Sequence, residues 1–142
     1  NDELLRKAAE SGCYGLFIGF ESLAQKTLQS HHKNINHADR YRELVKKIHD
    51  RGIGIEGSFI FGSDQDDPSV FQRVAEFCEE TKIEAAVFAI LTPYPGTRLY
   101  EQWTREDRIL SRNWDLYDMG HVVFRPRGMS VEQLQEGSQK TY

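Results

Sequence analysis

The sequence predicts an α/β protein built on a parallel sheet, and two features of the chain lead to this fold class. The first is a set of three apolar stretches, at residues 14–20, 58–61 and 85–91, each followed by Gly, Pro or polar residues. Apolar side chains at successive positions are typical of strands that are covered on both faces, as in parallel sheets clad by helices. The second is their spacing, because segments with helical periodicity lie between them, as in βαβ units.

The segments around these strands have the signals of amphipathic helices. Before the first strand, the pattern of residues 2–11 predicts a short helix. Apolar residues at helical spacing run through 38–51, after a candidate N-cap at Asn36, and Gly52 can end this helix. An Asp-Pro pair predicts the start of the next helix, over 68–81. We therefore expect the three strands to pair in parallel, with the two longer helices on one side of them.

The C-terminal part of the chain has a different character. After a rigid Pro-Tyr-Pro-Gly turn, Thr97 is a candidate cap for a short helix, and residues 122–124 predict a short strand. Residues 130–133 form a Ser-x-x-Gln capping box that opens a last helix. We interpret 1–97 as the parallel β/α part and 98–142 as a small α+β extension.

Composition and charge exclude several classes of protein. The 142 residues are 39% hydrophobic and 28% charged, which is typical of a soluble globular domain. The chain has no apolar run of about 18 residues, so no membrane span is predicted, and a net charge of −4 argues against a nucleic-acid partner. Its two cysteines have neither metal-ligand nor disulfide spacing, so we expect a reduced, cytoplasmic protein. No metal ligands are predicted, since His31, His32, His37 and His49 lack the spacing of a zinc site.

Several motifs, taken in order, resemble the second half of a radical SAM domain. Gly-Phe-Glu-Ser at 19–22 ends the first strand, and Lys33 lies some ten residues further on. Gly-Ile-x-Ile-x-Gly-Ser-Phe-Ile-Phe-Gly-x-Asp follows at 52–64, and Leu-Thr-Pro-Tyr-Pro-Gly-Thr at 91–97. The aromatic segment 108–126 resembles the C-terminal extension of the group that often carries an N-terminal cobalamin-binding domain. The resemblance covers essentially the whole chain.

This resemblance implies a fold, a reaction and cofactors. The fold would be the last three βα units of a partial TIM-type barrel, followed by the start of the extension. In that family a CxxxCxxC loop binds a [4Fe–4S] cluster, which cleaves S-adenosylmethionine (SAM) to a 5′-deoxyadenosyl radical, and cobalamin is a possible further cofactor for methyl transfer. The cysteine loop is absent from this sequence, which also lacks an initiator Met. We therefore expect a fragment of a radical SAM enzyme that is inactive by itself.

The resemblance also implies which residues contact SAM, although it assigns no catalytic residue. The polar end of the first strand would face the ribose or the amino-acid end of SAM, because a carboxylate accepts hydrogen bonds from hydroxyl groups. A lysine would pair with the methionyl carboxylate. The backbone and apolar side chains of the second strand, and the tip of the third, would lie along the adenine. The predicted set is Glu21, Ser22, Lys33, Ser58, Phe59, Phe61, Leu91 and Thr92.

Two other interpretations and one further partner stay open. The chain could belong to a β/α-barrel hydrolase in which Glu21 is the acid or the nucleophile, or it could be a non-enzymatic α/β interaction domain. Besides a small-molecule cofactor and an unknown substrate, the expected partner is the missing N-terminal part of the same protein. Because open apolar strand edges recruit partners, we also expect self-association through the edge of 16–20.

Overall fold

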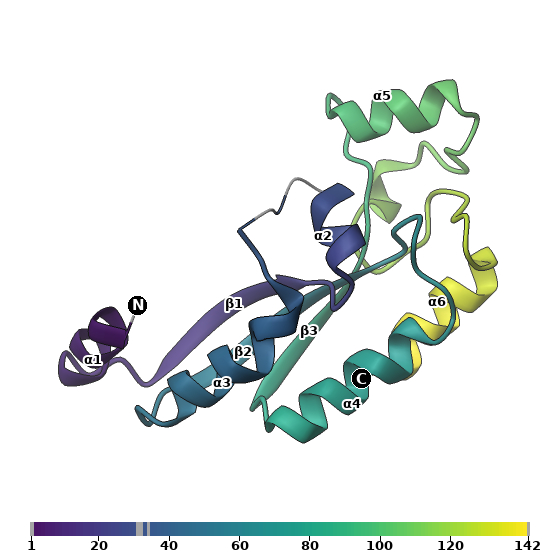
Figure 1. Cartoon of the computed structure of the whole chain (residues 1–142). Coiled ribbons are helices and arrows are strands. Elements are labelled where there is room, and N and C mark those ends of the chain that lie inside the picture. The colour runs from purple at the N-terminus through teal and green to yellow at the C-terminus, as the bar shows by residue number, and fades with distance from the viewer. Residues whose placement is uncertain (1, 31–32, 34, 142) are drawn as a thin grey trace. The chain divides into compact units, whose positions relative to one another are not determined.

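The computed structural model describes residues 2–30, 33 and 35–141, and Figure 1 shows the course of the chain. The elements in chain order are α1 (Asp2–Glu10), β1 (Gly15–Glu21), α2 (Gln25–Ser30), η1 (Ala38–Arg40), α3 (Tyr41–His49), β2 (Gly54–Phe61), α4 (Val70–Thr81), β3 (Ala85–Ile90), α5 (Arg98–Arg105), η2 (Trp114–Leu116) and α6 (Val131–Lys140). Within the described ranges, no helix combines the length and the apolarity that a bilayer crossing requires.

The chain forms two compact units. Unit 1 contains Asn1–Phe59 and Arg73–Val87. Unit 2 contains Ile60–Gln72 and Phe88–Tyr142. Each unit therefore combines segments that are distant in the sequence. The predicted boundary after residue 97 stays a prediction.

The three predicted strands form one sheet in the order β1-β2-β3, visible in Figure 1. β1 pairs in parallel with β2, in a register that begins with Gly15 opposite Gly54. The helical crossovers between successive strands, α2 with α3 and then α4, are those of βαβ units. The α/β fold class and the parallel pairing predicted from the sequence are thereby confirmed.

An aromatic cluster forms the centre of the core of unit 1. Phe20 of β1 stacks on Phe59 of β2, with 5.4 Å between the ring centroids. Tyr41 of α3 meets the ring of Phe20 edge-on at 4.9 Å, and Phe77 of α4 does so at 5.7 Å. Offset stacked and edge-on contacts are the arrangements that aromatic rings prefer. Because both helices contact the same ring, α3 and the C-terminal part of α4 lie on the same face of the sheet, as predicted.

The expectation that both faces of the strands are covered is wrong for the described chain. Along β2, buried positions alternate with half-buried or exposed ones, and the buried set includes both Phe59 and Phe61. On the opposite face, Phe17 of β1 is 66% exposed and Val87 of β3 is also exposed. The physical reason is that the two crossover helices pack on one face, so the apolar side chains of the other face lack a covering layer among the described residues.

Two helix starts also differ from the predictions. Asn36 does not cap α3; its side-chain amide instead donates to the carbonyl oxygen of Gly19 at 3.1 Å, and a single 3₁₀ turn, η1, precedes the helix. The helix predicted from residue 68 begins at Val70, because Asp67 Oδ1 accepts from the amide of Ser69 at 2.8 Å and holds a turn there. A polar side chain near a helix start can form a hydrogen bond either with the helix or with another backbone group. Its position in the sequence therefore does not decide which residue is the first of the helix.

In unit 2, the predicted caps are confirmed. Thr97 Oγ1 accepts from the amide of Tyr100 at the start of α5. Ser130 and Gln133 form the reciprocal capping box that begins α6. The strand predicted at 122–124 is reduced to an isolated antiparallel bridge between Ile109 and Phe124.

A charged network packs the extension against the loop that follows β2, within unit 2. Arg108 donates two hydrogen bonds to the carboxylate of Asp64, the shorter of 2.6 Å. Its guanidinium lies 4.2 Å from the ring centroid of Trp103, and its Nε donates to the carbonyl oxygen of Arg125 at 2.9 Å. A bidentate pair on an aromatic face suits the planar guanidinium. This contact therefore fixes the start of the extension relative to the end of β2.

Gly137 in α6 allows a close helix contact, and its replacement gives a first prediction. A Cβ atom at this position would lie 2.1 Å from the ring of Phe71, which itself packs edge-on against Phe61 at 4.9 Å. Alanine normally stabilises a helix interior by about 1 kcal/mol relative to glycine. Here we expect Gly137→Ala to lower the free energy of unfolding by about 1–3 kcal/mol, because the ring must move. Urea denaturation checks the sign, and an increase in stability would contradict this packing.

Candidate functional site

Glu21 ends β1 in an irregular backbone conformation. The register places Gly19 opposite Ser58 but Glu21 opposite Phe59, so that Phe20 is an extra residue and β1 contains a bulge. Glu21 has a φ of 64°, in the left-handed region that non-glycine residues seldom occupy. Bulges and strained backbone of this kind occur preferentially next to functional sites. The end of β1 therefore has the local geometry of a site that aims a carboxylate.

The bulge places the Glu21 carboxylate over the less covered face of the sheet. A Cβ atom on Gly19 would lie 2.8 Å from Glu21 Oε1, so the glycine leaves room for the carboxylate. Since Gly19 is opposite Ser58 in the parallel register, the side-chain positions of both residues share one face. Ser58 is half-buried there. Two of the predicted SAM contacts, Glu21 and Ser58, thus lie on the same face of the sheet.

Lys33 forms an ion pair with this carboxylate. Its Nζ lies 3.1 Å from Glu21 Oε1, although the two residues are far apart along the chain. The Glu21 side chain is 17% exposed and that of Lys33 is 49% exposed. An ammonium group has three donors, so one bond to Glu21 leaves donors for a second anion. The structure therefore brings together two of the side chains that the sequence predicts as a site.

Two polar side chains hold the backbone that precedes Glu21. Tyr41 donates its hydroxyl to the carbonyl oxygen of Phe20 at 2.7 Å, and Asn36 donates to that of Gly19. Burial raises the pKa of Tyr41 to about 12; a hydrogen bond with Asn36 acts against this, and the charge of Glu21 adds to it. The hydroxyl therefore keeps its proton at neutral pH and stays a donor. The sequence predicted neither contact, because nothing in a helical pattern indicates where a tyrosine hydroxyl points.

Ser22 shapes the turn after Glu21. Its side chain is buried, and its Oγ accepts from the amide of Ala24 at 3.1 Å. The amide of Ser22 donates to the carbonyl oxygen of Phe20. This is the hydrogen-bonded turn that serine often forms before a helix. Ser22 therefore supports the turn into α2, and its predicted contact with SAM stays a prediction.

The predicted contacts of Phe59 and Phe61 with the adenine stay predictions, and the burial of the two side chains limits how they could be made. Both side chains are fully buried. Phe59 stacks in the aromatic cluster of unit 1, whereas Phe61 of unit 2 packs on Phe71 and Phe88. A ring enclosed in this way has no surface for a ligand, so only backbone groups of these residues could lie along an adenine. The sequence does not show which face of the strand meets the helices, so this burial could not be predicted from it.

The remaining predicted contacts belong to unit 2, at the end of β3. The amide of Leu91 donates to the carbonyl oxygen of Phe61 at 2.8 Å, which continues the sheet for one residue. Thr92 is buried, and its Oγ1 donates to the carbonyl oxygen of Ile90 at 2.9 Å. Leu91 is half-buried and lies at the strand end, where parallel α/β proteins bind ligands.

The residues of this chain do not fit an iron–sulfur cluster. Cys13 and Cys78 are its two cysteines, and both are free. Burial raises the pKa of the Cys78 thiol to about 11, whereas metal binding requires a thiolate. The described residues contain no group of three or more potential metal ligands. His49 contacts Glu84 at 3.3 Å, and the predictions made for His31 and His32 fall outside the described residues.

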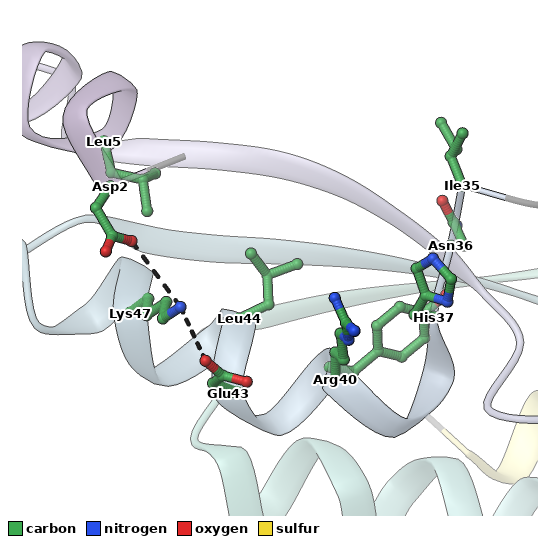
Figure 2. A pocket seen from close by; sticks show the side chains of 10 residues that line it. Asp2, Leu5, Ile35, Asn36, His37, Arg40, Glu43, Leu44 and Lys47 are labelled. Atoms are coloured by element: carbon green, nitrogen blue, oxygen red, sulfur yellow. Dashed lines mark ion pairs between the residues drawn. The ribbon is translucent and has the colours of Figure 1, made fainter.

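A hollow on the surface of unit 1 lies between α1 and α3 (Figure 2). Leu5 and Leu44 line its floor, and Lys47 bridges Glu43 at 2.8 Å and Asp2 at 4.0 Å on its rim. Figure 2 shows these three charged side chains directed toward one another, so they satisfy one another on the surface. Exposed ion pairs of this kind contribute little free energy. We assign no chemistry to this hollow.

Comparisons with known proteins place these features in context. The chain is 40% identical, over 94% of its length, to a bacteriochlorophyllide d C-12(1)-methyltransferase of Chlorobaculum tepidum. It is 29% identical over 85% of its length to a bacteriochlorophyllide d C-8(2)-methyltransferase of the same organism, and 29% identical over its full length to an uncharacterised methyltransferase of Pyrococcus horikoshii. The chain is similar to methyltransferases. It spans 29%, 27% and 31% of the lengths of these three relatives.

A solved structure has the same fold. The radical S-adenosylmethionine methyltransferase TsrM from Kitasatospora setae, whose structure contains cobalamin and a [4Fe–4S] cluster, matches 95% of this chain with a TM-score of 0.64. The match covers 27% of TsrM at 18% sequence identity, so it establishes the similarity of fold alone. No protein-family model matches the chain.

Proposed function

We propose that this chain is the SAM-binding, C-terminal part of the barrel, with the start of the extension, of a radical SAM methyltransferase whose methyl transfer depends on cobalamin. The observation that carries the proposal is the Glu21–Lys33 pair at the bulged end of β1. Its support from relatives is the similarity to two bacteriochlorophyllide methyltransferases and the TsrM-like fold. The chain spans about three-tenths of the length of these relatives. The cluster ligands, which this chain does not supply, would belong to another part of such a protein.

The charges at the end of β1 fit the polar ends of SAM. The Glu21 carboxylate can accept hydrogen bonds from the ribose hydroxyl groups. Lys33 is half-exposed and holds Glu21 through one contact, so its ammonium group can pair with the methionyl carboxylate. These two side chains would bind and orient the cofactor. The contacts of Leu91 and Thr92 with the adenine remain predictions for unit 2.

The chain does not fit the cluster, and we derive no reaction step through it. A [4Fe–4S] cluster that is held by three cysteines requires more thiolates than the two free cysteines of this chain supply. By the resemblance, the cluster would cleave SAM and cobalamin would carry the methyl group. We therefore infer that this chain alone binds SAM without cleaving it. Self-association through the edge of β1 likewise remains a prediction.

The hydrolase alternative has less support. Glycoside hydrolysis requires two carboxyl groups that flank the bond to be cleaved. In the described contacts, Glu21 pairs with the cation Lys33, and Asp64 in unit 2 pairs with Arg108 and Arg127. The described contacts therefore give Glu21 a cation and no second carboxyl group as its partner.

The similarity to the two bacteriochlorophyllide enzymes also supports a class of substrate. A relative that is 40% identical over 94% of this chain acts on a bacteriochlorophyllide. We infer that the methyl acceptor is a flat, conjugated tetrapyrrole ring that bears a carboxylate.

The test is SAM binding by this chain and three variants. Association costs several kcal/mol, so we expect a dissociation constant of roughly 1 mM, which corresponds to about −4 kcal/mol. Each charged hydrogen bond contributes about 1.5–3 kcal/mol, so Glu21→Ala and Lys33→Ala should each weaken binding by at least about 10-fold. His49→Ala removes a polar side chain at the C-terminal end of α3. This variant should leave the SAM affinity unchanged. Equilibrium dialysis with radiolabelled SAM measures all four.

The possible outcomes distinguish a wrongly assigned site from a general loss of stability. Parent-like binding by both the Glu21 and the Lys33 variants would show that the site is wrong, even if the fold is right. Equal weakening by His49→Ala would show that the losses reflect general destabilisation, so the melting temperature of each variant is measured alongside.

A further inference from the structure

Three aromatic side chains of unit 2 form a cluster that the SAM-binding proposal does not use. The ring of Trp114 lies 4.9 Å from that of Tyr117 and 6.2 Å from that of Tyr100, between ring centroids. They come from α5, from η2 and from the residue after η2. The cluster therefore joins two elements of the extension into one aromatic surface.

Trp114 is the exposed member of this cluster. Its side chain is 53% exposed, whereas Trp103, the other tryptophan of the chain, is 2% exposed beneath Arg108. Large aromatic side chains are usually mostly buried, because each can remove a large apolar area from water. An exposed tryptophan with aromatic support on its inner side indicates a surface that contacts something apolar.

The support behind Trp114 is rigid. Tyr117 is buried, and its hydroxyl donates to the carbonyl oxygen of Ser111 at 2.7 Å. Asn113 caps the 3₁₀ turn η2, since its Oδ1 accepts from the amide of Asp115. The cap at Asn113 thus holds the backbone around Trp114, and the rings of Tyr100 and Tyr117 contact its side chain. Pre-ordered aromatic surfaces bind flat ligands at a low entropic cost.

The cluster is connected to the end of β3, also within unit 2. The loop that follows Tyr117 returns to the strand, where the amide of Ile90 donates to the carbonyl oxygen of Met119 at 2.7 Å. Met119 has a φ of 65°, and Asp118 Oδ1 accepts from the amides of Gly120 and His121 to hold this turn. Ligands of parallel α/β proteins bind beyond the C-terminal ends of the strands. The aromatic surface is therefore connected to the end of β3 by this hydrogen bond.

A positive charge accompanies the aromatic surface. Arg112 is exposed, two residues before Trp114 in the sequence. Burial raises the pKa of Tyr117, the charge of Tyr100 adds to this increase, and the charge of Arg112 opposes it. Arg112 is the basic residue nearest to Trp114 in the sequence. A flat aromatic surface with an adjacent cation complements a flat ring that carries a carboxylate.

We propose that Trp114, supported by Tyr100 and Tyr117, is a stacking surface for a flat, conjugated macrocyclic substrate, whose carboxylate pairs with Arg112. This proposal rests on the substrate class inferred above. It excludes saturated ring systems as preferred ligands, because these lack a π face that can stack on indole.

The test uses chlorophyllide a as the probe, with the 142-residue chain and without SAM. Binding is followed by the induced circular dichroism of the chlorophyllide bands. Since stacking on an aromatic side chain is worth about 1–3 kcal/mol by alanine substitution, Trp114→Ala should weaken binding by about 5- to 150-fold. Trp114→Phe should stay within about threefold of the parent. Arg112→Gln should weaken binding several-fold, by an amount that shrinks as the salt concentration rises.

Two controls give the experiment its specificity. Tyr14→Ala removes an aromatic side chain of unit 1 that is 89% exposed, so it should leave binding unchanged. Cholate, a saturated ring system with a carboxylate, should displace the chlorophyllide at least about 10-fold less well than a second flat macrocycle, protoporphyrin IX. Parent-like binding by Trp114→Ala, equal weakening by Tyr14→Ala, or equal competition by cholate would each overturn the proposal.

This result is independent of the SAM measurement. If chlorophyllide does not bind but SAM binds with the predicted dependence on Glu21 and Lys33, the stacking surface is wrong and the proposed function stands. If chlorophyllide binds through Trp114 but SAM does not bind, the stacking surface stands and the cofactor assignment fails.

Discussion

Phe59→Ala is expected to lower the free energy of unfolding by about 3–5 kcal/mol, the range for truncating a buried phenylalanine. The ring is fully buried and stacks on Phe20 of the neighbouring strand. Phe77 of α4 also contacts it, at 6.1 Å between centroids, so alanine would leave a cavity between the sheet and the helix. Because domains of this size are stable by only about 5–15 kcal/mol, this loss could leave the protein largely unfolded.

The milder variant Phe59→Leu keeps the measurement interpretable, and urea denaturation should give a loss of about 1–2 kcal/mol. The matched control is Phe17→Ala on β1, since Phe17 is apolar, belongs to the same sheet and is 66% exposed. We expect Phe17→Ala to change the stability by less than about 0.5 kcal/mol. Equal losses for the two phenylalanines would show that the helices do not cover the face of the sheet described here.

Arg108→Ala is expected to cost about 3 kcal/mol of stability, measured as a shift in the urea midpoint. The side chain is 7% exposed and its bidentate partner Asp64 is 26% exposed, so the pair is largely shielded from water. Breaking a buried pair by removing one partner costs about 3–5 kcal/mol. The lower end applies here because Asp64 keeps a contact with Arg127 at 3.5 Å.

Two further variants identify the origin of this loss. Arg108→Lys should recover less than half of it, because a lysine cannot form the bidentate contact or lie flat on Trp103. Lys46→Ala breaks an exposed pair with Asp50 and should cost less than about 0.5 kcal/mol. If Arg108→Lys were as stable as the parent, charge alone would account for the contact, and the geometric explanation would be wrong.

The sequence was sufficient to predict the elements of the fold because their signals are local. Successive apolar residues indicated the three strands, and glycines with positive φ, such as Gly12 and Gly52, ended the segments before two of them. The caps at Thr97 and Ser130 were predicted for the same reason, since a cap requires one residue type at a fixed distance from an amide.

The face of each strand that the helices bury, and the contacts within the site, could not be predicted from local signals. A run such as Ser58 to Phe61 is apolar or small on both sides, and only the packing of the helices decides which residues are enclosed. The Glu21 bulge depends on the pairing of two strands, and its fixation by Asn36 and Tyr41 depends on long-range contacts. The resemblance assigned Glu21 and Lys33 separate contacts with SAM, and their ion pair is seen only in the structure, because spacing alone does not place a loop lysine beside a strand end.

The most direct test of the central claim is the map of SAM binding on the folded chain. ¹⁵N-labelled protein is titrated with SAM to about 10 mM, and the backbone amide shifts are followed by NMR. We expect saturable shifts at residues 19–24 and at Lys33, with a midpoint of roughly 1 mM and with loss of the response in Glu21→Ala. Shifts confined to the hollow between α1 and α3, or no saturable shifts at the end of β1, would contradict the proposal that this chain contributes the Glu21–Lys33 pair to a SAM site.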